Sequence, residues 1–159
     1  MTKRRTKQKM PSKAAFAALG VAGLYVLGSA VGETEVPAAA ATKPTVHLSA
    51  TGTKCIEPAR ALKRHGFKDG NLVQAIASAA AESGCDNNAV NHNSDGSVDR
   101  CFMQINSVNK AKGLSTLDGC AKAAKKIQGK QGWSAWSSHT SGADRKFLPM
   151  ARDVAAAIR

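Results

Sequence analysis

The sequence predicts an α+β domain that is mainly α-helical and contains one small β-hairpin. The first observation is an apolar pattern with helical spacing, formed by Leu72, Val73, Ile76, Ala79 and Ala80. Alanines fill the other faces of this helix, so it is apolar nearly all round and belongs in the centre of the domain. The second observation is the polar, turn-rich segment 91–99 around Asp95 and Gly96, which predicts the hairpin.

The first 41 residues have the pattern of an export signal. Residues 3–13 contain six Lys and Arg and no acid, residues 14–32 carry no charge, and four alanines occupy 38–41. This order is typical of a secretory signal peptide, here cleaved after Ala40 or Ala41. An uncleaved membrane anchor is the alternative, because the apolar segment approaches the length that spans a bilayer. The positive flank places the rest of the chain outside in either case.

We therefore assign residues 1–41 to a signal peptide or N-terminal anchor, 42–53 to a flexible leader and 54–159 to the folded domain. The 159 residues have a formal net charge of +12, and residues 42–159 contain 17 Lys and Arg against 9 Asp and Glu. Such a basic surface implies an anionic partner, either nucleic acid, acidic lipid or the bacterial cell wall. We do not expect nucleic acid, since the sequence lacks helix-turn-helix, zinc-finger and aromatic RNA-binding motifs.

The four cysteines all follow the export signal, and an even number in an exported chain predicts two disulfides. They are Cys55, Cys85, Cys101 and Cys120, for which three pairings are possible. No two of them form a Cys-x-x-Cys motif, and a zinc site would need His65 or His92 at irregular spacing. We therefore expect no metal and no other cofactor.

Two helices are expected before the hairpin. The first covers 55–64, with Pro58 in its first turn and Gly66 just past its end. The second begins at Asn71, an N-cap residue that forms a capping-box pattern with Gln74, and ends at Gly84.

Two carboxylates flank the polar segment. Glu82 lies in the last turn of the central helix, where the negative end of the helix dipole favours the protonated form that a general acid requires. Asp99 lies on the strand that returns from the hairpin. We expect the two carboxylates to face one gap, which is the arrangement that glycoside hydrolysis needs.

The rest of the chain is expected to be core, loop and helix. Phe102, Met103 and Ile105 read as core residues around the amide of Gln104, and 110–119 reads as a loop. A helix is expected over 119–128, capped by Asp118 and closed by Gly129, with a basic side that is either a solvated face or a track for a polymer. That side contains Lys122, Lys125, Lys126 and Lys130. A last short helix is expected over 154–158, and Trp133 or Trp136 should lie in the core.

These motifs resemble the catalytic core of the lysozyme-like proteins. The matching residues are Glu82-Ser83, the segment 89–99, Met103-Gln104-Ile105-Asn106-Ser107 and the Gly-x-x-Ala-Trp pattern 132–136. Animal-type lysozymes and the small bacterial and phage transglycosylases of the soluble lytic type both share the pattern. The resemblance implies a lysozyme-like fold with Glu82 and Asp99 as catalytic residues. It also implies substrate contacts from Gln104, Asn106, Asn91 and Asn93.

The bacterial branch of this family has cysteines at positions that match Cys55 and Cys120. The resemblance thus implies a Cys55–Cys120 disulfide, which leaves Cys85 to pair with Cys101. The chain also departs from the family at three places. Arg100-Cys101 stands where an apolar or aromatic residue and a Gly are usual, Val108-Asn109-Lys110 replaces sugar-stacking tryptophans, and His139 replaces a frequent Tyr.

We expect from this resemblance a secreted or envelope-associated bacteriolytic enzyme that acts on peptidoglycan. It would cleave the β-1,4 bond between N-acetylmuramic acid and N-acetylglucosamine, as a lysozyme or as a lytic transglycosylase. The alternative is a catalytically inactive, cationic protein that binds the wall or assists secretion. The expected partner is the glycan strand, bound by a monomer that touches the membrane only through an uncleaved N-terminal segment.

Overall fold

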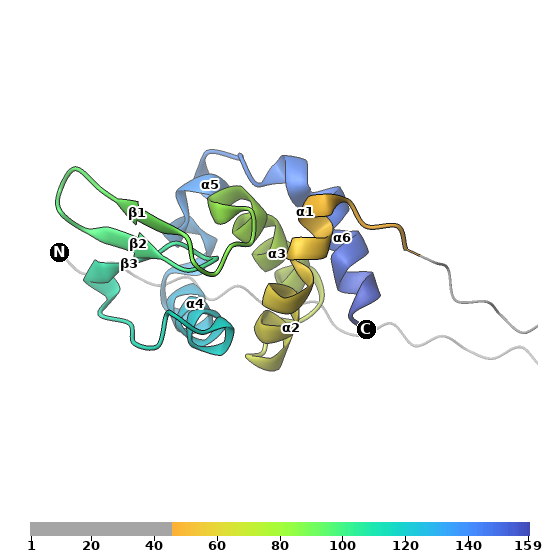
Figure 1. Cartoon of the computed structure of the whole chain (residues 1–159), viewed down its shortest axis with the longest axis horizontal. Helices are drawn as coiled ribbons and strands as arrows, with labels where there is room; N and C mark the ends of the chain where they lie inside the picture. The colour runs from red at the N-terminus through yellow and green to blue at the C-terminus, as the bar shows by residue number, and fades with distance from the viewer. Residues whose placement is uncertain (1–45) are drawn as a thin grey trace, which may run out of the picture. The chain divides into compact units, whose positions relative to one another are not determined.

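The computed structural model describes residues 46–159. The predicted signal peptide or anchor lies outside these residues, as does the beginning of the predicted leader. Within 46–159, no helix is both long enough and apolar enough to cross a membrane. The described residues form the predicted, mainly helical α+β fold, with a small antiparallel sheet at one end of the domain (Figure 1).

The elements of residues 46–159 follow one another with short connections. The α-helices are α1 (Ala50–Lys54), α2 (Ile56–Arg64), α3 (Asp69–Ser83), α4 (Leu117–Gln131), α5 (Ser137–Thr140) and α6 (Leu148–Ala157). The strands are β1 (Val90–His92), β2 (Val98–Arg100) and β3 (Ile105–Asn106). Three 3₁₀ turns complete the set: η1 (Ser107–Asn109), η2 (Gly132–Ala135) and η3 (Arg145–Phe147).

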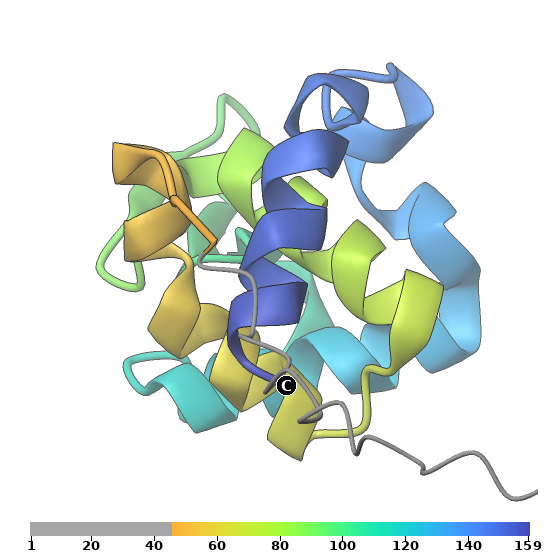
Figure 2. The ribbon, with the colours of Figure 1, turned by 90° about the vertical axis from the view of Figure 1, so that its right-hand side faces the viewer.

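Helix α3 is the centre of the core, as predicted. Its residues from Ala75 to Ala80 are all buried, and α2 and α6 both pack against it. Figure 2 shows α6 between α1 and α2 on one side and α3 on the other. The largest apolar side chains that are fully buried are Phe67, Phe102, Leu62, Ile76, Met103, Ile105 and Val154.

The predicted hairpin is present, and a third strand extends it. The order is β1-β2-β3, and both pairs are antiparallel. Gly96 adopts a φ of 83° in the connection between β1 and β2, which glycine tolerates without a steric penalty. Asp95 Oδ1 accepts a hydrogen bond from the Ser97 N–H at 2.9 Å. Hydrogen bonds from the side chain and backbone of Ser97 hold the pKa of Asp95 below its usual value.

The expected start of α3 is wrong by three residues. The helix begins at Asp69 after the N-cap residue Lys68, and Asn71 and Gln74 form no capping box. Asn71 Oδ1 instead accepts a hydrogen bond from Trp133 Nε1 at 3.2 Å, and the Gln74 amide donates to Asp144. Tertiary partners therefore use the two side chains that local rules assign to the cap.

The expected ends of α4 are also wrong. Thr116 is the N-cap residue, and its Oγ1 accepts a hydrogen bond from the Gly119 N–H at 3.0 Å. Asp118 instead accepts hydrogen bonds from the Arg64 guanidinium, which hold the pKa of this carboxyl below its usual value. The helix continues through Gly129 and ends at Gln131.

The outer helices extend beyond the expected bounds. Helix α1 overlaps the predicted leader, because residues 50–53 are helical and Gly52 is buried, so a flexible leader can extend only to Ser49. Helix α6 begins at Leu148, six residues before the expected start at Val154, and Pro149 occupies its first turn.

Helix α3 ends in two consecutive left-handed residues. Gly84 and Cys85 both have a φ of 65°. The Cys85 N–H donates to the Ala79 carbonyl at 3.1 Å, and the Gly84 N–H donates to the Ala80 carbonyl at 3.0 Å. These two hydrogen bonds satisfy carbonyls near the end of the helix, and the left-handed backbone at both residues reverses the chain.

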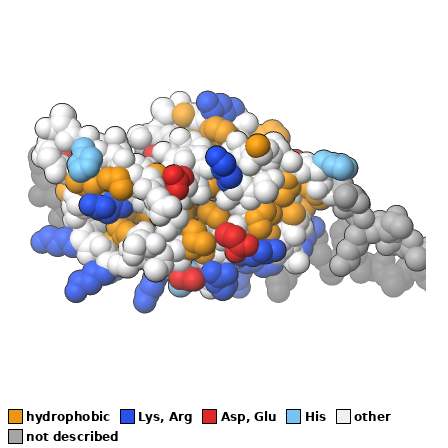
Figure 3. Space-filling view, viewed as in Figure 1, with side chains coloured by type: hydrophobic (Ala, Val, Ile, Leu, Met, Phe, Trp, Pro, Cys, Tyr) orange, Lys and Arg blue, Asp and Glu red, His pale blue; other side chains and the backbone are white. Residues whose placement is uncertain are grey.

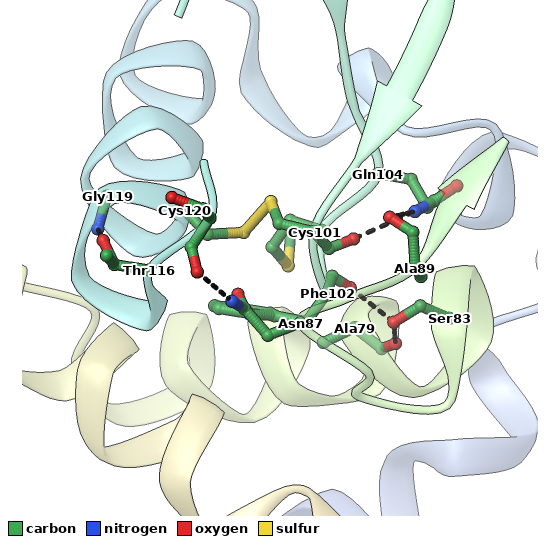
Figure 4. Close-up of a disulfide and its surroundings, with 12 residues drawn as sticks. Ala79, Ser83, Asn87, Ala89, Cys101, Phe102, Gln104, Thr116, Gly119 and Cys120 are labelled. Carbon is green, nitrogen blue, oxygen red and sulfur yellow. Dashed lines mark hydrogen bonds between the residues drawn. A yellow bond between two sulfur atoms is a disulfide. The ribbon is translucent and has the colours of Figure 1, made fainter. Parts of the chain in front are cut away.

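Two disulfides are present, as predicted, but the pairing implied by the resemblance is wrong. Cys55 is bonded to Cys85, and Cys101 is bonded to Cys120, with Cα–Cα distances of 5.1 Å and 6.1 Å. The turn after α3 brings Cys85 to the junction of α1 and α2, where Cys55 lies. Cys101 follows β2 and lies beside the first turn of α4, which contains Cys120 (Figure 4).

We predict that peptide mapping without reduction finds these two links. Tryptic cleavage after Arg60, Arg100 and Lys110 places each cysteine in a different peptide, so the pairs can be read directly. Replacing Cys101 and Cys120 together by serine should lower the free energy of unfolding by about 3 kcal/mol, because the unfolded chain regains loop entropy. A peptide that links Cys55 to Cys120 would contradict the observed pairing.

Candidate functional site

Glu82 lies in the last turn of α3, as predicted, and its side chain is half-buried. Its Oε1 accepts a hydrogen bond from the backbone N–H of Ser138 in α5 at 3.3 Å. A backbone N–H can only donate, so Oε1 is the acceptor in this contact, and Oε2 has no hydrogen-bond partner among residues 46–159. The contact with Ser138 therefore orients Glu82 as well as fixing its position.

Ser83 fastens the end of α3 to the segment that follows β2. Its Oγ contacts the Phe102 carbonyl at 3.0 Å and the Ala79 carbonyl at 3.3 Å, and it accepts a hydrogen bond from the Asp86 N–H at 3.1 Å (Figure 4). Phe102 is fully buried, so the backbone of this segment cannot shift without disturbing the core. The helix that carries Glu82 and the segment after Asp99 are thus held to each other.

Asp99 lies in the middle strand, at the centre of a polar row. The sheet register places it between Asn91 on β1 and Asn106 on β3. Its Oδ2 accepts a hydrogen bond from the Asn93 amide at 2.9 Å. The same amide donates to Ser97 Oγ at 3.0 Å.

Two more side-chain amides, of Asn106 and Asn91, join Asn93 in the network around the buried Ser97. The Asn106 amide donates to Ser97 Oγ at 2.9 Å, and the Asn91 amide donates to Asn93 Oδ1 at 3.0 Å. The structure therefore brings together Asp99 and three of the four predicted substrate-binding residues. Within residues 46–159, no hydrogen bond links Glu82 to this group.

Gln104, the fourth predicted substrate-binding residue, supports the turn after β2. Its φ is 45°, and its side-chain amide donates to the Cys101 carbonyl at 2.9 Å and to the Ala89 carbonyl at 3.4 Å (Figure 4). The side chain is half-buried. Its Oε1 accepts no hydrogen bond from the described residues, so it is available to a donor on a bound molecule.

A buried hydrogen-bond network centred on Asp144 lies behind Glu82, and the sequence did not predict it. Asp144 is only 1% exposed, and its Oδ2 accepts hydrogen bonds from Gln74 and from Ser78 Oγ. The same oxygen lies 2.9 Å from His139 Nδ1. The Asp144 N–H also donates to the Ser138 carbonyl at 3.1 Å, so the network holds the residue that contacts Glu82.

No local pattern identifies Asp144, because its partners are up to 70 residues away in the sequence. The one available signal was His139, where the chain departs from the family, followed five residues later by an acid.

The two tryptophans lie side by side near this network. Trp136 is buried and donates a hydrogen bond from Nε1 to the Met103 carbonyl at 2.9 Å, so one tryptophan belongs to the core, as predicted. The Trp133 ring is half-buried, 5.5 Å from that of Trp136 and 6.1 Å from that of His139. Among the described residues, no group of three or more His, Cys, Asp or Glu could hold a metal ion.

We predict that Asp144→Ala lowers the free energy of unfolding by about 3 kcal/mol, because it leaves buried donors without their acceptor. Asp153→Ala is the matched control, since Asp153 is exposed on α6, and it should change the free energy by less than about 0.5 kcal/mol. Chemical denaturation followed by circular dichroism measures both. Equal, small changes would show that the network does not stabilise the fold.

Two comparisons found similarity between this chain and known proteins. Residues 59–138 match a family model described as a lysozyme-like domain. The matched range contains Glu82, Asp99 and the whole sheet. The chain is also similar to lysozyme C of Crax fasciolata, with 33% identity over 117 residues that cover 58% of this chain and 90% of that protein.

Proposed function

This chain belongs to the lysozyme-like family, and from that membership we propose that it cleaves the β-1,4 bond between N-acetylmuramic acid and N-acetylglucosamine in peptidoglycan. Membership supports a peptidoglycan glycosidase or transglycosylase in general. The observation that carries the specific proposal is Glu82 at the end of α3, half-buried and held by the Ser138 N–H.

In this proposal Glu82 is the general acid. It donates the proton on Oε2 to the glycosidic oxygen as the bond breaks and positive charge develops on the sugar. The hydrogen bond at Oε1 becomes stronger when the carboxylate forms, because hydrogen bonds to charged acceptors are stronger than those to neutral ones. The Ser138 N–H therefore stabilises the ionised product of the proton transfer.

Asp99 is the second carboxylate of the proposal. The Asn93 amide donates to its Oδ2 and holds its orientation. In a hydrolase, Asp99 stabilises the oxocarbenium-like charge or attacks as a nucleophile. In a lytic transglycosylase the acetamido group of the sugar attacks instead, and Glu82 acts with less help from Asp99.

The amides of Asn91, Asn93, Gln104 and Asn106 are the proposed sugar contacts. Asn91, Asn93 and Asn106 belong to the network around Asp99, which already fixes their side chains. They therefore lose little conformational entropy when a glycan binds. The substrate therefore meets a polar surface that is already arranged.

We also propose that the protein is exported through residues 1–41 and acts as a monomer. Two disulfides support export, since they form and persist in oxidising environments. N-terminal sequencing of protein recovered outside the cell distinguishes cleavage near Ala41 from a retained anchor.

Glu82→Gln should abolish wall cleavage and leave the fold intact. General acid catalysis contributes about 10²–10⁴-fold, and glutamine keeps the shape but cannot donate the proton. Zymography on a peptidoglycan gel measures the loss. Glu57→Gln is the control, because Glu57 is exposed on α2 and should be dispensable. A folded Glu82→Gln protein with full activity would contradict the assignment of Glu82 as the general acid. Wall binding without cleavage by the native protein would support the inactive alternative.

Asp99→Asn should reduce the rate of cleavage by less than Glu82→Gln. The change removes the negative charge that stabilises the transition state and keeps the contact with Asn93 possible. Mass spectrometry of the products separates the two enzymes, because a reducing end indicates hydrolysis and a 1,6-anhydro end indicates transglycosylation. Complete loss in Asp99→Asn, together with reducing ends from the native protein, would contradict the transglycosylase assignment.

A further inference from the structure

One face of helix α3 carries a polar stripe, formed by Gln74, Ser78 and Glu82. These residues are spaced by four, and such residues lie on one side of a helix. Gln74 and Ser78 both donate hydrogen bonds to Asp144 Oδ2, whereas Glu82 Oε1 accepts one from the Ser138 N–H. The segment from Ser138 to Asp144 therefore contacts this stripe at both of its ends.

Asp144 is the buried anchor of the segment. It is only 1% exposed, and besides the two contacts from α3 its Oδ2 lies 2.9 Å from His139 Nδ1. A carboxylate can only accept, so the imidazole nitrogen donates in this contact. Three side chains thus share one acceptor oxygen. Without that acceptor they are left unpaired in the interior, and the segment loses its polar attachment to α3.

Ser138 is held in place by its backbone and not by its hydroxyl group. Its Oγ is buried and has no hydrogen-bond partner among residues 46–159. Its carbonyl accepts hydrogen bonds from the Asp144 N–H at 3.1 Å and from Ser141 Oγ at 3.4 Å. The direction of the N–H that reaches Glu82 therefore depends on these backbone contacts, and the contact from Asp144 is the one that connects Ser138 to the buried anchor.

We propose that Asp144 is a positioning residue for Glu82, which it reaches through the backbone of Ser138. This inference rests on the proposed function, since it assumes that Glu82 is the general acid. Asp144 contacts α3 on one side and Ser138 on the other, so it fixes the distance between the Ser138 N–H and the carboxyl group. A donor that is already aimed at the charge formed in the reaction lowers the barrier more than one that must first reorient.

A purely structural role for Asp144 predicts a different result, namely lost stability with an unchanged rate of cleavage. Asp144→Asn separates the two roles, because it keeps the size of the side chain and removes the charge. Gln74→Met is a milder second variant, which keeps Asp144 and removes one of its donors. It carries the test if Asp144→Asn does not fold.

Two controls account for charge and for stability. Figure 3 shows Lys and Arg side chains at several places on one face of the domain, so a change of net charge alone alters the attraction to an anionic wall. Asp153→Asn makes the same change of charge at an exposed position on α6. Leu62→Ala removes a fully buried apolar side chain from α2 and so lowers stability without touching the network.

The kinetic constants are measured on soluble peptidoglycan fragments, with the full-length variants, at a temperature at which circular dichroism shows all of them folded. In Asp144→Asn, kcat should fall by about tenfold or more, because a displacement of about 1 Å at a reacting group can cost about a hundredfold. KM should change little, since the contact matters most in the transition state. Gln74→Met should lose less of kcat, and both controls should keep it.

The backbone amide resonance of Ser138 provides a readout that needs no activity. In the isotope-labelled native protein, Glu82→Gln should shift this resonance, because the amide donates to the carboxyl group. The same substitution should shift it much less in the Asp144→Asn background, where the contact is loosened.

Three results would overturn the positioning role. They are an unchanged kcat in Asp144→Asn, an equal loss of kcat in Leu62→Ala, and a Ser138 resonance that responds to Glu82→Gln equally in both backgrounds. A native protein that shows the expected resonance shifts but cleaves no peptidoglycan would instead contradict the proposed function, and it would support the contact between Asp144, Ser138 and Glu82.

Discussion

The reversal of the chain after α3 is the constraint on which the rest of the structure depends. Gly84 and Cys85 both adopt left-handed backbone, which costs about 1–2 kcal/mol for the non-glycine residue. The disulfide to Cys55 offsets this, since closing a loop of this length contributes about 3–4 kcal/mol. The reversal ends the helix one turn after it leaves the core, so Glu82 is held at the edge of the core.

The second disulfide likewise stabilises a left-handed residue, here at the end of β2. Cys101 has a φ of 63°, which is left-handed backbone. It stands at the position where the family usually has a glycine. A cysteine there carries a steric cost of about 1–2 kcal/mol, and the bond to Cys120 offsets it by about 3 kcal/mol. The cysteine therefore adopts a backbone conformation that glycine would adopt without a steric cost. It replaces the freedom of glycine by a covalent tie between the sheet and α4.

Features that depend on neighbouring residues could be predicted from the sequence. The apolar pattern around Ile76, the left-handed stop at Gly84 and the hairpin turn at Gly96 are all local, and each predicted element is present. The position of Glu82 in the last turn followed from two of them. Its partner Ser138 did not, because the contact joins residues 56 positions apart.

The features that could not be predicted are those in which a distant partner outcompetes a local one. Asn71 and Gln74 form a plausible cap, yet a tryptophan indole and the buried Asp144 use their side chains. Asp118 is a plausible cap as well, but Arg64 binds it and Thr116 caps the helix. The disulfide pairing fails for the same reason, because it depends on which helix ends meet in space.

Under the proposed function, the site holds a glycan without sugar-stacking rings at residues 108–110. Val108 is 71% exposed and lies in the segment where the resemblance leads one to expect sugar-stacking rings. The polar row around Asp99 remains, but a neutral hydrogen bond contributes only about 0.5–1.5 kcal/mol net. Under the proposed function, a few such bonds hold the glycan weakly, and the basic surface of the domain would add electrostatic attraction to an anionic wall. Added salt screens the attraction between the basic surface and the wall, but it leaves the hydrogen bonds to Asp99 and Glu82 in place. Under the proposed function, salt therefore weakens attachment to the wall more than it affects cleavage of the glycosidic bond.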